Sequence, residues 1–504
     1  MTIRRFREIK KRRKKVKLTV GVENFGPISR GKIGLKSLTI FIGPNNSGKS
    51  YAAMLIHSIF ESFTESYLPR LPFILKPRIS FKMIDIKKFI GEFSELRKFI
   101  NDLIEGKEIE VPKHTIDKVI NKIFEGIIEG ELNKEIFGSY ASPLKELVRI
   151  GKRTFKLGVN FNSYNIQLKY QRNRLKIEEY PQLNIRILVK LIDMPTYRYK
   201  VEVKGKKISI QMGKGLRERS LDRDFIFHRL IDSIFEVCTS YILENIAIPC
   251  YYLPAARSGI LQGHKALAAS IVKKAPYVGI ERFEIPKFSG VISDFISTVI
   301  NLPREKGYFY KFAQDFEEEL IEGEIVVRIK QENISEITYN FRNTEIPLHR
   351  ASSTVSELAP LILYLKYIVE PGDILIVEEP EAHLHPENQR ILAKYIVRLI
   401  REGVNILITT HSEYLLEQLN SFILLGRIKE ERRVKQYKYS REDYLESNEI
   451  AVYRFDYDRR SRGYKIVAVK VTEEDGISQE EFIRIYEILY EEIFKLRKEL
   501  SHNN

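Results

Sequence analysis

Apolar residues occur along this chain in short runs whose spacing predicts an α/β protein. Residues 17–25 alternate between apolar and polar side chains, as in a half-buried strand, and residues 35–42 form a more continuous apolar run that predicts a second strand. In residues 51–63 the apolar side chains recur at helical spacing. The start of the chain is therefore predicted to run strand, glycine-bounded loop, helix.

Similar apolar segments return after residue 248 and predict the rest of a core. Towards the end of the chain, residues 452–458 and 464–471 predict a hairpin, and a final helix with one apolar stripe is expected from residue 478 onwards. The strands expected in the core lie within residues 250–260, 324–341, 373–380 and 404–412.

The stretch between these two parts has a pattern of its own. Helical spacing covers residues 84–150, alternation typical of strands covers 153–212, and a helix is expected over 222–244. We interpret this stretch as an inserted helical and β lobe. The expected divisions are a basic tail at 1–16, a first part of the main domain at 17–64, the lobe at 65–247 and a second part of the main domain at 248–504.

Composition and charge narrow the class of protein. The 504 residues carry a net charge of +16, but residues 1–17 hold ten basic residues and one acidic residue, so much of the excess lies in the tail. Two cysteines cannot form a disulfide framework in a chain of this size. The longest apolar stretch, residues 358–369, contains Lys366 and is shorter than the ~20 residues that span a bilayer. The basic start is not followed by an apolar signal segment, so a cytoplasmic protein with no membrane partner is expected.

The strongest chemical signal is the sequence GPNNSGKS between the predicted strand and helix, which matches the phosphate-binding pattern GxxxxGK[ST]. Glycines allow successive backbone N–H groups to face phosphate oxygens, and a helix N-terminus adds positive potential. Lys49 is expected to bridge the β- and γ-phosphates of ATP, and Ser50 to bind Mg²⁺. The candidate nucleotide-binding residues are Gly43, Pro44, Asn45, Asn46, Ser47, Gly48, Lys49 and Ser50.

Polar side chains also follow two of the later buried strands. The apolar run 373–377 ends in Glu378 and Glu379, where an α/β sheet places its ligands. Glu378 is suited to bind Mg²⁺, and Glu379 to orient or deprotonate the attacking water. The run 405–410 is followed by His411, which can donate to a γ-phosphate and sense its loss.

The order of these motifs resembles an ABC-type ATPase head. NFGPI, PAARSG, EEPEAHLHP and TTHS resemble more closely the ATPases related to the OLD (overcoming lysogenisation defect) family and, more distantly, SMC proteins. The resemblance covers about residues 17–64 and 248–500. It implies an α/β head, a mixed sheet flanked by helices, that uses ATP and Mg²⁺ and forms a homodimer with ATP at the interface.

The same resemblance assigns further site residues. Ser352, Ser353 and Thr354 correspond to the signature segment, which contacts the ATP of the opposite subunit, and His383 lies in the D-loop segment 382–385. His411 corresponds to the switch histidine. The chain departs from the ABC pattern at Glu378, where aspartate is usual, and in a signature segment without paired glycines. The expected catalytic residues are Glu379, His411 and Lys49, and the expected metal ligands are Ser50 and Glu378.

Three other residue sets leave alternatives open. Arg257 could contact phosphate or form an interdomain salt bridge. His383 and His385 invite a metal-ligand interpretation, but no third ligand follows at a suitable spacing, so the D-loop is favoured. Asp456 and Asp458 superficially match a Toprim nuclease, yet the following residues predict a hairpin. We therefore expect no nuclease in this chain; a nuclease or toxin effector would be a separate protein.

The leading functional hypothesis is an ATP-hydrolysing dimeric switch in DNA maintenance or anti-phage defence. The alternatives are a nucleotide-gated scaffold with slow turnover and, less favoured, an ABC transporter ATPase subunit, which the long insertion and the basic tail fit poorly. The insertion shows no heptads that would form an SMC-type arm, so a compact lobe is expected. DNA or RNA contact is the weaker expectation, since basic surface segments are usually solvated. Its candidates are the tail, Lys200, Lys204, Lys206 and Lys207, and the run Arg432, Arg433, Lys435, Tyr437, Lys438 and Tyr439.

Overall fold

A computed structural model describes most of the chain, and its contacts form two compact units. Residues 27–53 and 250–504 belong to the first unit, and residues 17–26 and 54–249 to the second. From residue 17 onwards the chain therefore passes between the units three times, once within helix α2 (Lys49–Glu65). The described residues are 17–65, 89–161, 164–183, 185–191, 198–203, 206–211, 223–263, 288–329, 335–342 and 344–502.

A mixed β-sheet organises the first unit. Its strands follow the order β11-β15-β16-β3-β17-β18-β2. Neighbours from β11 to β17 are parallel, β17 and β18 form the expected antiparallel hairpin, and β18 runs parallel to β2. The mixed sheet confirms the expected α/β class. The strands are β2 (Ile28–Gly34), β3 (Leu38–Ile42), β11 (Cys250–Leu253), β15 (Ile374–Glu378), β16 (Asn405–Thr409), β17 (Ile450–Asp458) and β18 (Gly463–Val469).

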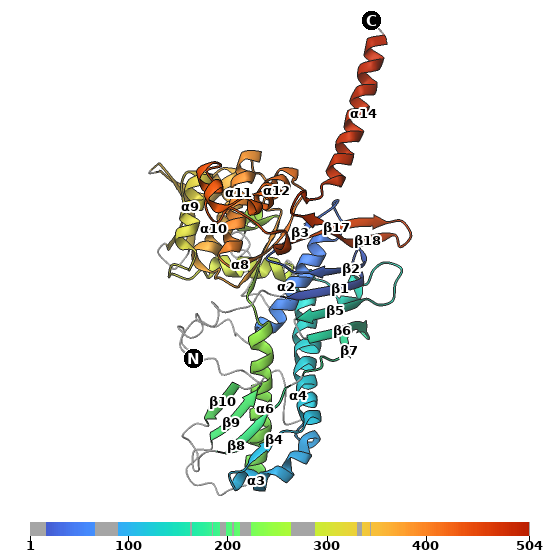
Figure 1. Ribbon diagram of the computed structural model, residues 1–504, viewed down its shortest axis with the longest axis vertical. Helices are drawn as coiled ribbons and strands as arrows, with labels where there is room; N and C mark the ends of the chain where they lie inside the picture. The colour runs from blue at the N-terminus through green and yellow to red at the C-terminus, as the bar shows by residue number, and fades with distance from the viewer. Residues whose placement is uncertain are drawn as a thin grey trace, which may run out of the picture. The chain divides into compact units, whose positions relative to one another are not determined.

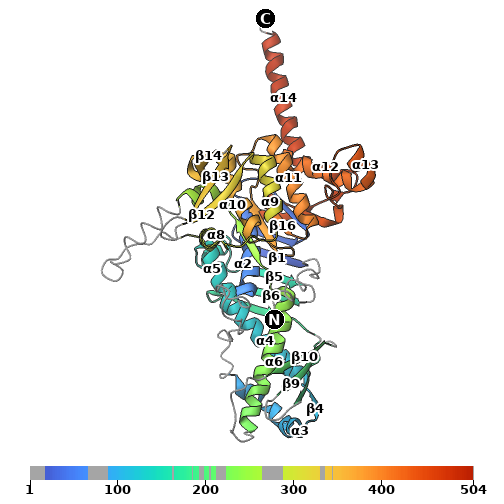
Figure 2. The same cartoon turned by 90° about the vertical axis from the view of Figure 1, so that its left-hand side faces the viewer.

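Helices pack on this sheet, whose central strands are buried along almost their whole length. Leu38, Ile40 and Ile42 point to one face of β3, and they share a core with Leu375 and Val377 of β15. The same core includes buried side chains of α9 (Tyr310–Ile321) and of four further helices, which lie together in Figures 1 and 2. These helices are α8 (Gly290–Ile300), α10 (Ser353–Tyr367), α11 (Pro386–Arg401) and α12 (Glu413–Arg427).

Residues 324–341 depart from the expectation of core strands. They form β12 (Glu324–Ile329) and β13 (Ser335–Phe341), which pair with each other and with β14 (Thr344–Pro347) in a separate antiparallel sheet. Arg328 is exposed whereas Ile325 is fully buried, so β12 has one polar and one apolar face. A strand with one polar face suits a sheet covered on one side only.

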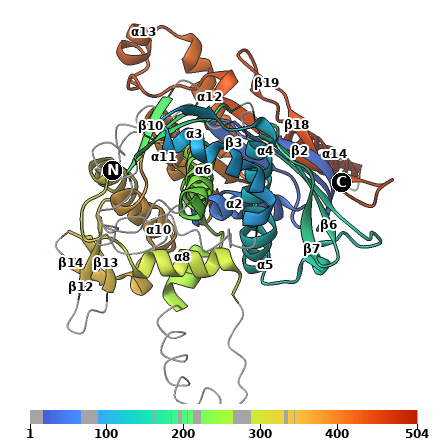
Figure 3. The same cartoon turned by 90° about the horizontal axis from the view of Figure 1, so that it is seen from below.

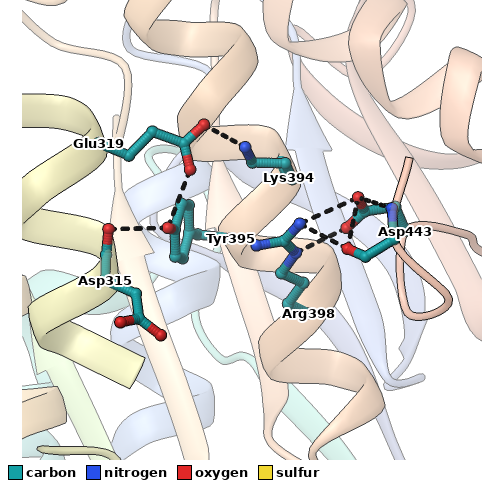
Figure 4. A network of polar contacts seen from close by, with 7 residues as sticks. Asp315, Glu319, Lys394, Tyr395, Arg398 and Asp443 are labelled. Atoms are coloured by element: carbon teal, nitrogen blue, oxygen red, sulfur yellow. Dashed lines mark hydrogen bonds and ion pairs between the residues drawn. The ribbon is translucent and has the colours of Figure 1, made fainter. Parts of the chain in front are cut away.

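Helix α9 (Tyr310–Ile321) is attached to α11 by a polar network, drawn in Figure 4. The Tyr395 hydroxyl donates to the Asp315 carbonyl at 2.9 Å and lies 3.0 Å from Oε2 of Glu319, which also pairs with Lys394. One helical turn further on, Arg398 binds both carboxylate oxygens of Asp443, at 2.6 and 3.0 Å. This network connects α9, α11 and the loop that follows α13 (Glu430–Lys435).

The second unit has the helical and β content expected of the lobe. Its strands pair antiparallel in the orders β1-β5-β6-β7 and β10-β9-β8-β4. Helices α4 (Lys113–Glu125) and α6 (Arg223–Ile246) lie side by side (Figures 1 and 3). The strands are β1 (Leu18–Phe25), β4 (Glu108–Glu110), β5 (Lys156–Phe161), β6 (Tyr164–Gln171), β7 (Arg174–Glu179), β8 (Leu188–Leu191), β9 (Arg198–Val203) and β10 (Lys206–Gln211).

The helical pattern of residues 84–150 is interrupted where the chain bends. Short strand β4 separates α3 (Ile100–Ile104) from α4 (Lys113–Glu125), and a wider π-helical segment, Gly126–Leu132, joins α4 to α5 (Asn133–Tyr140). The helix expected over 222–244 is confirmed as α6 (Arg223–Ile246).

The predicted final helix is also present, as α14 (Glu480–His502). In Figures 1 and 2 it extends away from the rest of its own unit. Among the described residues, none of the helices combines the length and apolar character needed to cross a membrane.

Candidate functional site

The phosphate-binding sequence forms a loop that only glycine permits at two positions. Gly43 has φ 130° and Gly48 has φ 102°, values that other residues rarely adopt. A Cβ atom on Gly43 would lie 3.0 Å from the Phe455 carbonyl oxygen, and one on Gly48 would lie 2.9 Å from the side chains of Pro27 and Ile28. The loop is therefore fixed in shape by the strands beside it, and it leads directly into α2.

Three parallel strands end beside this loop. Thr409 of β16 is paired with Glu378 of β15 on one side and with Phe41 of β3 on the other. The ladder continues past the strand ends, where Glu379 N–H donates to the Thr409 carbonyl at 2.9 Å and Thr410 N–H to the Phe41 carbonyl at 3.0 Å. One edge of the sheet thus carries the glycine-rich loop, the two glutamates and His411.

Lys49 is buried at the base of the loop. Its Nζ donates to the carbonyl oxygens of Gly43 and Pro44, each at 2.8 Å. Ser50 follows it in the first turn of α2 and is exposed. The ammonium group is therefore held among the backbone groups of the loop, close to the position of a bound phosphate in loops of this type.

Glu378 is the residue whose environment fits a divalent cation. Its Oε2 accepts a hydrogen bond from Ala255 N–H at 3.2 Å, whereas its buried Oε1 has no hydrogen-bond partner among the described residues. Buried Ser47 Oγ lacks such a partner as well. A buried carboxylate oxygen without a partner is costly unless a cation compensates it.

This cation would need oxygen ligands from the nucleotide as well as from the protein. In the part of the chain that the structure describes, no group of three or more His, Cys, Asp or Glu residues could hold a metal. Mg²⁺ commonly binds through one or two protein groups plus substrate phosphates. Glu378 and Ser50 therefore suit Mg²⁺ that arrives with ATP.

Glu379 and His411 lie side by side at the open end of the site. Glu379 has φ 43°, which turns the chain sharply after β15, and its half-exposed Oε1 lies 4.0 Å from His411 Nε2. Burial lowers the pKa of His411, the nearby Lys49 charge lowers it further, and Glu379 partly opposes both effects. His411 is consequently neutral at neutral pH and can donate one hydrogen bond from its ring.

Arg257 positions this turn, a role that the sequence did not reveal. It is 1 % exposed, and its guanidinium donates to the carbonyl oxygens of Glu378 at 2.7 Å and Glu379 at 3.2 Å. Nε donates to the Glu357 carbonyl at 3.0 Å and lies 3.4 Å from the Glu357 carboxylate. All these partners belong to the first unit. Of the two alternatives left open for Arg257, the interdomain salt bridge is contradicted, because its ion pair with Glu357 lies within its own unit.

Glu357 connects Arg257 to the signature and D-loop segments. Its Oε1 accepts from the Ser258 hydroxyl and lies 4.0 Å from His383 Nε2. Thr354 Oγ1 donates to the His383 carbonyl oxygen at 3.3 Å. The two segments therefore lie against each other in one subunit, and both Thr354 and His383 are accessible there.

The remaining signature residues begin α10. Ser352 caps the helix, since its hydroxyl accepts from Val355 N–H at 3.3 Å, and Ser353 is the first helical residue. Serine is favoured at this position because its oxygen satisfies an otherwise free N–H group. Ser353 is exposed.

Glu381 is a second residue missed from the sequence. Its Oε1 accepts from Thr410 Oγ1 at 2.5 Å and from His411 N–H at 2.9 Å, which fixes the backbone before α12. Burial raises the pKa of Glu381, although these two hydrogen bonds oppose the rise. The available signal in the sequence was its place in EEPEAH, two residues after Glu379.

The nucleic-acid candidates are only partly described. The tail and the side chains of the lysine hairpin lie outside the described residues. In the run after α12, Arg433 is buried, donates to the Leu425 carbonyl at 3.0 Å and stacks on Tyr444, while Tyr439 packs against Phe422. Arg433 therefore supports the fold, Tyr439 is half-buried, and Arg432, Lys435, Tyr437 and Lys438 are exposed.

The aspartates considered for a Toprim site are paired within the β17–β18 hairpin. Asp456 accepts from Arg454 at 2.7 Å, and Asp458 lies 2.8 Å from Lys465 Nζ. The hydrogen bond from Lys465 helps to lower the pKa of Asp458 to about 2. This arrangement agrees with a structural hairpin.

Comparison with known proteins identifies a family. Solved structures that resemble the chain include the SMC head domain from Thermotoga maritima (12 % identity, 91 % of this chain and 100 % of that chain, TM-score 0.31). Another is the Smc head domain with an extended coiled coil bound to the C-terminal domain of ScpA, derived from Pyrococcus furiosus (12 %, 95 % and 100 %, TM-score 0.36). A third is the SmcHead bound to the C-winged helix domain of ScpA (11 %, 90 % and 98 %, TM-score 0.34).

At these identities no residue role is transferred from those proteins. Comparison with curated proteins gave no match. The profile of the AAA ATPase domain, by contrast, matches residues 18–416, which is more than half of the chain and includes the glycine-rich loop, Glu378, Glu379 and His411. The chain therefore belongs to the AAA ATPase domain family.

Proposed function

We propose that this protein hydrolyses ATP to ADP and phosphate at the edge where β3, β15 and β16 end. The observation that carries the proposal is the meeting of four features at that edge: the glycine-rich loop, buried Glu378, accessible Glu379 and neutral His411. Each supplies a separate requirement of phosphoryl transfer to water, namely phosphate binding, metal binding, positioning of water and contact with the γ-phosphate.

The chain's own residues account for most of this chemistry. Lys49 moves from the carbonyl oxygens of Gly43 and Pro44 to the β- and γ-phosphates, while the backbone N–H groups of the loop bind phosphate oxygens. Mg²⁺ held by Ser50 and Glu378 would neutralise charge on the β- and γ-phosphates. Glu379 accepts a hydrogen bond from the attacking water, and His411 donates to the γ-phosphate.

We further infer that ATP is bound between two copies of the chain. The accessible residues Ser353, Thr354 and His383 are grouped on one surface by the contact between Thr354 and the His383 carbonyl. A hydroxyl-rich helix start is a suitable donor set for a phosphate presented by a second subunit. If the two subunits associate when ATP is bound and separate when it is lost, the protein acts as an ATP-dependent switch.

DNA maintenance or anti-phage defence is the proposed setting, with a separate nuclease or toxin effector. The order of the motifs supports this setting, and so does the ion pairing of Asp456 and Asp458 within their own hairpin. DNA or RNA would then be contacted by the basic tail or by the exposed residues Arg432, Lys435 and Lys438.

The test is the substitution Glu379→Gln, which keeps the shape of the side chain but removes its capacity to accept a proton. We expect the rate of ATP hydrolysis to fall by about 100-fold or more, since general-base catalysis contributes about 10²–10⁴-fold. ATP binding should persist, and ATP should promote association of two subunits.

Glu402→Gln makes the same chemical change at an exposed position at the end of α11 and serves as the control. Its turnover should equal that of the unmodified protein. Unchanged phosphate release by Glu379→Gln would exclude the proposed role of Glu379.

A further inference from the structure

Helix α14 presents an apolar surface to solvent. Its exposed side chains include Leu489, Ile493, Leu496 and Leu500, each at least 47 % exposed. Near its start, the Tyr486 hydroxyl donates to Glu413 Oε2 at 2.8 Å, and Gln479, just before the helix, binds Glu417 at 2.6 Å. Exposed apolar side chains on an isolated helix are unfavourable in water, so this helix requires a partner.

The spacing of the apolar residues indicates what kind of partner fits. Apolar residues recur along α14 at alternating intervals of three and four residues, which is the pattern of the a and d positions of a coiled coil. Ile493 at an a position lies between leucines at the d positions 489 and 496, a combination that favours two strands. The a positions are Tyr486, Ile493 and Leu500, and the d positions are Phe482, Leu489 and Leu496.

We propose that α14 pairs in parallel with α14 of a second copy of this chain. The flanking charges select this partner and direction. In a parallel pair, Glu492 at a g position faces Arg497 at the following e position of the second copy. An antiparallel pair with the same apolar layers would place Glu492 against Glu492 of the second copy and Arg497 against Ile483.

This pairing differs from the proposed ATP interface because it needs no nucleotide. It deepens the proposed dimeric function, and its role in catalysis rests on that function. A permanent pair of α14 helices would keep two ATPase sites at high effective concentration while ATP opens and closes the contact between them. A parallel, in-register pair also has the two-fold symmetry that a homodimer requires.

The first test measures the mass of the full chain without nucleotide by analytical ultracentrifugation. We expect a dimer at protein concentrations of tens of micromolar. Ile493→Asp places two charges in the apolar seam and should weaken the dimer by more than tenfold. Ile488→Asp is the matched control, because Ile488 is just as exposed on the same helix but lies outside the seam.

The second test determines whether the two α14 helices run parallel or antiparallel. Glu492→Arg and Arg497→Glu should each weaken the dimer, and the two changes together should restore it, because the pair then forms with reversed charges. In the Leu489→Cys variant, the thiols at position 489 of the two subunits should form a disulfide only if the helices are parallel. The Ile488→Cys variant should form no such disulfide, because position 488 lies outside the seam. The natural cysteines, Cys238 and Cys250, are buried and give little background.

Three results would overturn the inference: a monomer without nucleotide, equal effects of Ile493→Asp and Ile488→Asp, or a stronger dimer in Glu492→Gln, because this neutral change removes a like-charge contact only from an antiparallel pair. These results are independent of the ATPase assignment, since hydrolysis by Glu379→Gln is measured separately. A nucleotide-free monomer with normal Glu379-dependent turnover would remove the α14 pairing and leave the ATPase proposal intact.

Discussion

At the residue scale, the site depends on how one buried arginine holds two backbone carbonyls. Glu379 can position a water only if the turn after β15 keeps its left-handed conformation, a backbone arrangement that costs energy for a residue other than glycine. Arg257 stabilises this turn from behind by binding the carbonyls of Glu378 and Glu379. We therefore regard Arg257 as a positioning residue that acts through the glutamates.

Substitution of Arg257 by Lys tests this role. A single ammonium group cannot reproduce the several hydrogen bonds of the guanidinium, so we expect kcat for ATP hydrolysis to fall by about tenfold or more while KM changes little. Steady-state kinetics and thermal unfolding should be measured together, with Arg350→Lys as a control at an exposed position in the same unit. A loss of stability with normal kcat would assign Arg257 a structural role only.

Sequence reasoning named candidate residues with recognisable chemistry, whose roles stay predictions, and missed the residues that hold them in place. Glu378 ends a buried strand, Lys49, Glu379 and His411 come shortly after one, and the parallel arrangement places all four at one edge. The contacts of Arg257 and Glu357 were not predictable, because these residues are 100 positions apart and lack a motif that links them. Such contacts depend on tertiary packing that single-residue patterns do not contain.

At the scale of elements, α11 is attached to its neighbours by charged groups as well as by apolar packing. Figure 4 shows Tyr395 and Arg398 on this helix, with partners on α9 and in the 440–443 loop. Asp443 is almost fully buried and accepts from Arg398 and from the Ser440 N–H. Burial alone would raise the pKa of Asp443, but these hydrogen bonds and the Arg398 charge lower it below its ordinary value of 3.8.

Asp443→Asn should lower the free energy of unfolding by about 1–3 kcal/mol at neutral pH, because hydrogen bonds to a charged group are lost. The folded-state pKa is lowered, so the stabilising effect is fully present above the ordinary value of 3.8 and is lost progressively as the pH falls from there through the lower folded-state pKa. Urea unfolding from pH 7 to pH 3 should show the two proteins converging at low pH.

Asp315→Asn is the control for this comparison, since Asp315 enters the network only through its backbone carbonyl and its side chain is exposed. A difference between Asp443→Asn and the unmodified protein that stays constant down to pH 3 would contradict the assigned titration.

The elements themselves were largely predictable, but their assembly was less so. Continuous apolar runs correctly indicated β3, β15 and β16, and alternation indicated the strands of residues 156–211. The pairing of β12 with β13 and β14 was missed, because an alternating strand can join any sheet with one open face. Strand β4 was missed because its three residues are too few to show a period.

At the scale of the whole molecule, a dimer with two interfaces would have two separate affinities. The α14 pair would act at all times, and the ATP interface only in the nucleotide-bound state. Because linked binding events depend on effective concentration, loss of the first interface should weaken the second without any change at the ATP site.

The dependence of ATPase rate on protein concentration follows from this arrangement. Between about 1 and 50 μM, we expect the rate per subunit of the unmodified chain to be nearly constant, because the subunits remain paired. The rate of Ile493→Asp should be lower at dilution and should rise with concentration. A steady-state phosphate-release assay measures both, with Ile488→Asp as the control; a flat profile for Ile493→Asp would contradict the coupling of the two interfaces.

The crossing of the chain between the two units has a consequence for biosynthesis. Strand β3 with its glycine-rich loop emerges early from the ribosome, but its neighbours β16 and β17 begin at Asn405 and Ile450. Contacts this distant in sequence form slowly because a long loop must close first. In the nascent chain, the apolar strand β3 and the loop after it therefore remain without their neighbouring strands while several hundred further residues are synthesised. Chaperones would be most important to this protein during that interval.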